Sequence, residues 1–203
     1  MQLELWLIYL ITCVGLSLSP GPNGLLALTH GALHGNRKTL FTILGGAAGF
    51  TVVIALCMFG IGALIKSSLI WLTILKWIGG IYLVWLGIQV WRSPPIEPTT
   101  HIESKAVNGR WLFRQGLLAS LTNPKALLFF SAFLPQFIDP DRGLVLQFIV
   151  LALTFVVTEC FVEYFLATSA SRIRHWLRNI GKAFNRVCGG IFIAIGAALP
   201  LRT

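Results

Sequence analysis

Residues 19–23 read Ser-Pro-Gly-Pro-Asn (SPGPN) and interrupt the apolar run of residues 3–33, with LELWLIYLITCVGLSL before them and GLLALTHGAL after. Two prolines and a glycine are the strongest breakers that a helix can contain. A second stretch of this kind, TNPK at residues 122–125, interrupts another apolar run. The meaning of these breaks depends on the kind of helix that they interrupt.

The composition indicates membrane helices. The chain has 203 residues, of which 56% are hydrophobic and 11% are charged, and its mean hydropathy is +0.78. A soluble domain of this length carries roughly a quarter charged residues. Residues 39–65 hold no charge, and this run is longer than the ~20 residues that cross a bilayer. We therefore predict an all-α integral membrane protein.

Six apolar segments can be drawn, at residues 5–33, 39–65, 67–91, 115–138, 143–171 and 187–201. SPGPN breaks the first segment and TNPK breaks the fourth. The interval 92–114 is rich in proline and polar residues, which predicts one long exposed loop. Because three crossings precede this loop, the second set of three is inverted relative to the first. The sequence thus predicts a single membrane domain, 1–203, with six transmembrane helices in two inverted repeats, 1–91 and 115–203.

The sixteen Lys and Arg residues are unevenly divided between the two sides of these segments. The connections after segments one, three and five carry eleven of them, the opposite side carries three, and Lys76 and Lys125 lie inside segments. Cytoplasmic loops are enriched in Lys and Arg. We therefore expect the loop 92–114 in the cytoplasm and both termini in the periplasm. The net charge of +9 is explained by this topology signal, so no nucleic-acid partner is predicted.

The two breaks share their local chemistry. Ser19 before Pro20, and Asn123 before Pro124, each combine a residue favoured at a helix N-cap with proline at the first helical position. Both motifs predict helix restarts, whose free N–H groups and positive dipole ends attract anions. In lipid such a break is tolerated only where it faces protein or a cavity. Matching breaks in inverted halves are typical of a transporter's binding site; a proline kink that only shapes packing is the alternative.

The sequence resembles the RhtB/LysE family of amino-acid exporters in four stretches: SLSPGPN (17–23), HGALHGNRKT (30–39), LKWIGGIYLVWLGIQVWR (75–92) and LTNPKALLFFSAFLPQFI (121–138). Within that family it is most similar to the homoserine, homoserine-lactone and threonine exporters. The resemblance implies a six-helix efflux carrier of the bacterial inner membrane, which exports a small neutral amino acid or derivative by proton antiport. Many members carry an aspartate in the second segment, which GGAAGFTVV (45–53) lacks, whereas the acid that relatives often have in segment five is present as Glu159.

A zwitterionic amino acid needs donors at one end and an acceptor at the other. We predict that the substrate is bound by residues of the two breaks: Ser19, Pro20, Gly21, Pro22, Asn23, Asn123, Pro124 and Lys125. Its carboxylate is expected near the side chains of these motifs, with Lys125 as a cationic partner; the alternative for Lys125 is a side chain that reaches toward the cytoplasm.

Glu159 and Glu163 are predicted to couple protons, because ionisable groups inside membrane segments are functional candidates. Being four residues apart, they share one helix face. A carboxylate that alternates between Lys125, the substrate ammonium and water changes its proton affinity during the cycle. Glu159 is favoured, because Glu163 lies nearer the cytoplasmic end, where it could reach water.

Other functions remain as alternatives. His30 and His34 have the spacing of a metal pair, but no cysteine or acid obviously completes a site, so we expect no metal and no cofactor. The chain could instead be a passive channel or export another small solute or a metal ion. An intramembrane hydrolase would need a nucleophile with its base, which is not apparent, so no enzyme is predicted. Protons, a small amino acid and the lipid bilayer are the expected partners, and a homodimer is left open.

Overall fold

The computed structural model describes residues 3–19, 21–67, 69–92, 107–169, 182–183, 186–187 and 189–198. In these ranges every regular element is a helix, as predicted. The elements are α1 (Leu3–Leu18), α2 (Pro22–His34), α3 (Asn36–Ser67), α4 (Leu69–Arg92), α5 (Gly109–Leu121), α6 (Pro124–Phe133), the 3-10 helix η1 (Leu134–Phe137) and α7 (Leu144–Thr168). A further short apolar helix spans Gly189–Ala198.

Both predicted breaks are present. α1 ends before SPGPN and α2 begins inside it, and the two helices are bent by 55°. The pair formed by Gly109–Leu121 and Lys125–Phe137 is bent by 50° at TNPK. Among the described residues, two helices are long and apolar enough to cross a membrane by themselves, Asn36–Gly60 and Leu144–Thr168, and the number rises to four if each bent pair is one span.

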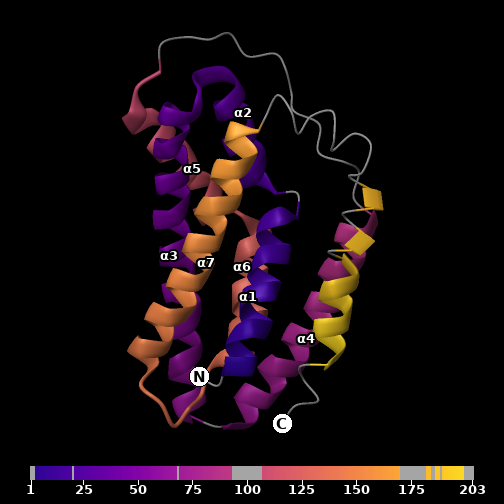
Figure 1. Ribbon diagram of the computed structural model, residues 1–203. Helices are drawn as coiled ribbons and strands as arrows, with labels where there is room; N and C mark the ends of the chain where they lie inside the picture. Colours follow the sequence, from indigo (N-terminus) through magenta and orange to yellow (C-terminus); the bar gives the residue numbers. More distant parts are fainter. Residues whose placement is uncertain are drawn as a thin grey trace.

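The helices form an elongated bundle (Figure 1). α1 and α2 follow one another along its length in one direction, and α5 and α6 follow one another in the opposite direction, with α3 and α7 beside them. Large apolar side chains are exposed on the outer faces of α3 and α7, among them Leu44, Leu56, Leu153 and Phe161. Buried polar side chains lie inside. This distribution suits a protein surrounded by lipid.

α3 and α5 pack closely because glycines line their contact. A β-carbon added at Gly45 would collide with the carbonyl of Phe113, and one added at Gly116 would collide with the carbonyl of Thr42. At Gly49 the added atom would meet Ser120 Oγ. Small residues let membrane helices approach to backbone contact. The close approach fixes α5, and with it the TNPK break, against α3.

Aromatic rings fill the bundle between α1 and the segment from α6 to η1. Tyr9, Phe129, Phe133 and Phe137 are at most 1% exposed. The ring centroids of Phe129 and Phe133 are 4.6 Å apart, those of Phe133 and Phe137 are 4.7 Å apart, and those of Tyr9 and Phe137 are 5.1 Å apart. The Tyr9 hydroxyl donates to the Leu151 carbonyl at 3.1 Å, which ties this cluster to α7.

Helix α5, which opens the fourth predicted segment, begins earlier than the sequence indicated. We expected a loop up to residue 114, but α5 starts at Gly109, where the Asn108 side chain accepts from Arg110 N at 3.1 Å as an N-cap. Leu112 in the first turns is fully buried, so packing extends the helix into the polar stretch. Residues 93–106 of the predicted loop, Pro20 and the ends of the sixth segment lie outside the described residues.

Candidate functional site

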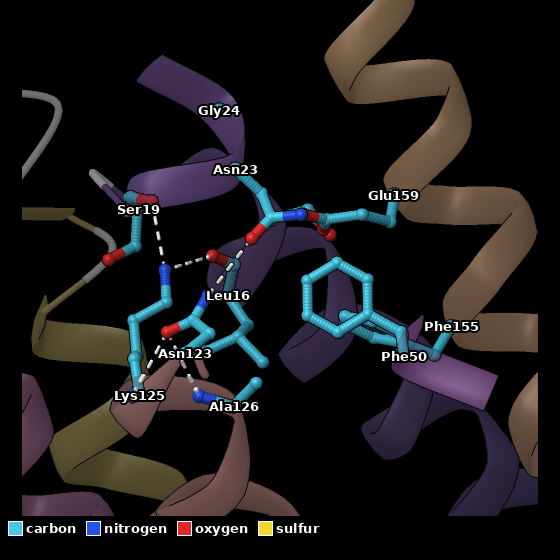
Figure 2. Close-up of a pocket in the computed structure, with 12 residues that line it drawn as sticks. Leu16, Ser19, Asn23, Gly24, Phe50, Asn123, Lys125, Ala126, Phe155 and Glu159 are labelled. Carbon is cyan, nitrogen blue, oxygen red and sulfur yellow. Dashed lines mark hydrogen bonds between the residues drawn. The ribbon is translucent and has the colours of Figure 1, made fainter. Parts of the chain in front are cut away.

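The two helix breaks meet at one small pocket. Its lining includes Ser19, Gly21 and Asn23 from the first break, Asn123 and Lys125 from the second, and Glu159 from α7. The amide of Asn123 donates to Asn23 Oδ1 at 3.5 Å, which links two residues one hundred positions apart. Figure 2 shows Asn23, Asn123 and Lys125 brought together beside Glu159. Five of the eight predicted binding residues therefore line one pocket. Pro22 and Pro124 begin α2 and α6 without belonging to the lining, and Pro20 lies outside the described residues.

The restart of α6 is built as the sequence indicated. Asn123 is the N-cap, and its side-chain oxygen accepts from the backbone N–H groups of Lys125 at 3.0 Å and Ala126 at 3.4 Å. Pro124 follows within the first turn. Because the cap already occupies these two donors, the free amides of this helix end are no longer available to an anion; the amide of Asn123 and the ammonium of Lys125 remain as donors.

The restart of α2 differs from the prediction. Ser19 is not its N-cap: the Ser19 N–H donates to the carbonyls of Gly15 at 3.0 Å and Leu16 at 3.2 Å, so the residue still belongs to the end of α1. Gly21 is the N-cap, with extended backbone and no side-chain cap, and Pro22 takes the first turn. The two prolines stand two residues apart, and the second one begins the helix. The first amides of α2 therefore have no side-chain acceptor.

Lys125 reaches across the pocket to the end of α1. Its Nζ donates to the carbonyl oxygens of Leu16 and Ser19, both at 3.0 Å. A cation is favoured at a helix C-terminus, where the terminal carbonyls lack intrahelical partners. This contact resolves the apparent conflict of a lysine at the start of its own helix, because the charge lies at the negative end of another. The Lys125 side chain therefore contacts the end of α1 and does not take the alternative course toward the cytoplasm.

Glycine at position 21 makes room for that ammonium. A β-carbon added there would lie 3.1 Å from Lys125 Nζ and 3.4 Å from its Cε. Such contacts are tighter than ordinary packing, so a side chain at residue 21 would press on the lysine. The glycine of SPGPN thus has a packing reason, because its extended backbone is one that other residues also adopt.

Glu159 and Glu163 are both buried inside the bundle. Glu159 is 7% exposed and Glu163 is 3% exposed, and in each carboxyl one buried oxygen has no hydrogen-bond partner among the described residues. The expectation that Glu163 could reach water is therefore wrong: α7 turns this residue inward with Glu159, because the two share a face. Figure 2 shows the side chains of Asn23 and Glu159 pointing toward one another.

Glu163 lies one helical turn beyond Glu159 on α7, close to Gly46 of α3. A β-carbon added at Gly46 would be 3.1 Å from Asn23 Nδ2 and 3.6 Å from Glu163 Oε2. Asn23 therefore lies between Glu163 on α7 and Asn123 at the break before α6. Two buried acids without full hydrogen bonding are costly in an apolar interior, which makes them functional candidates.

The histidines do not form a metal site among the described residues, where no group of three or more His, Cys, Asp and Glu side chains could hold an ion. His30 is buried, and its Nδ1 forms a hydrogen bond with Thr42 Oγ1 at 2.7 Å. The rings of His30 and His34 are 5.5 Å apart. His30 thus joins α2 to α3.

Sequence reasoning missed part of the pocket. Phe50 and Phe155 form one wall with their rings 5.2 Å apart and edge to face, and Ser17 contributes a buried hydroxyl. The carbonyls of Leu16 and Ser19 were also missed. In the sequence, Phe50 and Phe155 look like ordinary core residues, and a backbone carbonyl that accepts a hydrogen bond cannot be recognised. Ser17, a polar residue beside SPGPN, is the one pocket residue among these that the sequence could have indicated.

Comparison with known proteins gives consistent matches over the whole length. Residues 14–202 match the family model of the LysE type translocator. A homoserine/homoserine lactone efflux protein of Salmonella typhi is 38% identical over 201 residues, covering 98% of this chain and 97% of the relative. A leucine efflux protein of Klebsiella pneumoniae is 31% identical over 199 residues, covering 96% and 93%. No solved structure matches.

Proposed function

Because the chain belongs to the LysE type translocator family, we propose that it exports a small neutral amino acid or a derivative across the inner membrane by proton antiport. The observation that carries the proposal is the pocket where two broken helices meet beside a buried carboxylate. The names of the relatives, which are efflux proteins for homoserine, homoserine lactone and leucine, support the substrate class.

The proposed topology has six crossings in two inverted repeats, 1–91 and 115–203, with 92–114 in the cytoplasm and both termini in the periplasm. The opposite courses of the α1–α2 and α5–α6 pairs support it (Figure 1), because inverted halves require them. The α7 helix and the short helix Gly189–Ala198 would supply the fifth and sixth crossings. The excess of Lys and Arg on one side sets the orientation.

In the proposed binding mode the substrate carboxylate meets Lys125, the amides of Asn23 and Asn123, and the first amides of α2, which have no side-chain cap. The cavity that remains between these groups measures about 10 Å³, room for about one water molecule. Substrate binding therefore requires that the pocket widens. Lys125 is the side chain whose movement opens it most directly, because it crosses the pocket to reach α1.

Proton coupling is assigned to Glu159, with Glu163 as the next candidate. Glu159 and Lys125 line the same pocket. The carboxylate binds a proton more readily when the lysine moves away and less readily when a substrate ammonium arrives. Proton uptake and substrate binding then exclude one another, which is the requirement for antiport.

Transport by purified protein in proteoliposomes tests the proposal. Vesicles are loaded with homoserine, threonine or leucine, a pH gradient is imposed, and the flux of each is followed. We expect one or more of them to accumulate against its own gradient when protons flow the other way. A flux that ignores the pH gradient would identify a passive channel, and failure to move any amino acid would contradict the proposal.

A further inference from the structure

The C-terminal end of α1 binds a primary ammonium group in this structure. Lys125 Nζ lies 3.0 Å from the Leu16 carbonyl oxygen and 3.0 Å from the Ser19 carbonyl oxygen, and Figure 2 shows the ammonium between them. The last carbonyls of a helix lack intrahelical donors and carry its negative dipole end. They therefore form a site for a cation with several N–H donors, and an ammonium offers three.

The surroundings of this site hold further acceptors. Ser19 Oγ is a buried hydroxyl oxygen without a hydrogen-bond partner among the described residues, and the residue is 4% exposed. Glu159 lines the same pocket and also has a buried oxygen without a partner. Buried polar groups are normally hydrogen-bonded. Unused acceptors around a bound ammonium indicate that a second ligand group completes the site.

The α-ammonium of an amino acid is the same chemical group as the end of a lysine side chain. We propose that the carbonyl end of α1, Leu16 O with Ser19 O, is the subsite for the substrate's primary ammonium, and that Lys125 occupies it as a tethered substitute between transport events. On binding, the substrate ammonium replaces Lys125 at the carbonyls, and Lys125 turns to the substrate carboxylate. One cation replaces another, so the end of α1 keeps its partner throughout.

This inference rests on the proposed function and adds which end of the substrate is essential. Homoserine and homoserine lactone, the compounds in the name of one relative, share the α-amino group, whereas the lactone has no free carboxylate. A subsite for the ammonium at the end of α1 accounts for recognition of both. The carboxylate contact of Lys125 then adds affinity without being indispensable.

The test measures the affinity of purified full-length protein in nanodiscs for three probes: homoserine, homoserine lactone, and N-acetylhomoserine, which has a carboxylate but no ammonium. The pH is kept low enough that the amino group of the lactone is protonated. We expect wild-type protein to bind the first two and to bind N-acetylhomoserine at least about tenfold more weakly. Lys125→Met removes the tethered competitor, so the lactone should bind about tenfold more tightly if Lys125 holds the subsite nine-tenths of the time, while homoserine gains less because it loses its carboxylate partner.

The matched control is Lys38→Met, which changes an exposed lysine at the start of α3 and should leave all three affinities as in wild type. Unchanged or weaker lactone binding in Lys125→Met would overturn the inference while homoserine transport by wild-type protein still supports the proposed function. Absence of any homoserine, threonine or leucine transport by wild type would instead contradict the proposed function. If Lys125→Met melts below the assay temperature, wild-type protein decides alone: binding of N-acetylhomoserine as tight as that of the lactone contradicts the ammonium subsite.

Discussion

Replacing Gly45 by alanine adds one methyl group at the closest contact between α3 and α5. The new β-carbon would collide with the carbonyl oxygen of Phe113 and would lie 2.8 Å from its carbonyl carbon and 3.0 Å from Leu117 N, where ordinary contact begins at 3.4 Å. These are backbone atoms within a helix, so no rotamer change relieves the overlap. The two helices must separate by about an ångström or more along this contact.

Overpacking of this kind costs about 1–3 kcal/mol, which in a chain of 203 residues corresponds to a fall of about 2–12 °C in the melting temperature. The matched control is Gly60→Ala on the same helix, where an added β-carbon meets no atom of the described residues within 4 Å. There the better helix propensity of alanine should leave stability unchanged or raise it by up to about 1 kcal/mol. Thermal unfolding of both variants in the same detergent, followed by the loss of monodisperse protein, compares them directly.

Equal melting temperatures for the two variants would refute the reasoning, because the helix and the substitution are the same and only the neighbouring backbone differs. A lower melting temperature for Gly60→Ala than for Gly45→Ala would refute it more strongly, because the substitution without a close neighbour would then cost more stability than the one that collides with backbone.

Three further predictions concern transport and the pocket. At one proton per substrate, a gradient of one pH unit sustains about tenfold accumulation of the substrate. Glu159→Gln keeps the shape of the side chain but cannot ionise, so this accumulation should vanish while exchange of substrate across the membrane persists; accumulation like that of wild type would move the coupling role to Glu163. Asn123→Ala should lower the stability by about 1 kcal/mol, measured by thermal unfolding, because the N-cap of α6 is lost. Asn123→Ser, which can still cap the helix, should retain most of that stability. Single cysteines placed in 92–114 of a cysteine-free variant should resist membrane-impermeant thiol reagents in intact cells; ready labelling would reverse the topology.

The sequence was sufficient to predict the breaks and one of their caps. Proline inside an apolar run is an unambiguous signal, and Asn123 before Pro124 left one choice for the start of α6. SPGPN left two, because Pro20 and Pro22 can each begin a helix, and the local pattern did not show that Ser19 still bonds back into α1. The inward orientation of Glu163 depends on where α2 and α3 pack against α7, which no local pattern records.

The contact of Lys125 was beyond sequence reasoning for another reason. Its partners are the backbone carbonyls of Leu16 and Ser19, and every residue has a carbonyl. Which carbonyl becomes a ligand depends on where a helix ends and on what tertiary packing brings to that end. Local sequence signals therefore located the two breaks and the start of α6, whereas the chemistry between the breaks required the assembled bundle.

The burial of two glutamates on one face of α7 has a consequence for biosynthesis. Inserting a carboxylate alone into lipid is costly, yet the helix is otherwise strongly apolar, with a mean hydropathy of 2.3. The chain emerges from the ribosome from its N-terminus, and the elements that α7 packs against, α1, α2 and α3, all precede it. By the time residues 144–168 are synthesised, Asn23 and Gly46, which lie near these acids in the folded protein, are already part of the chain. The order of the helices along the chain thus means that the two acids are made after the segments that bury them.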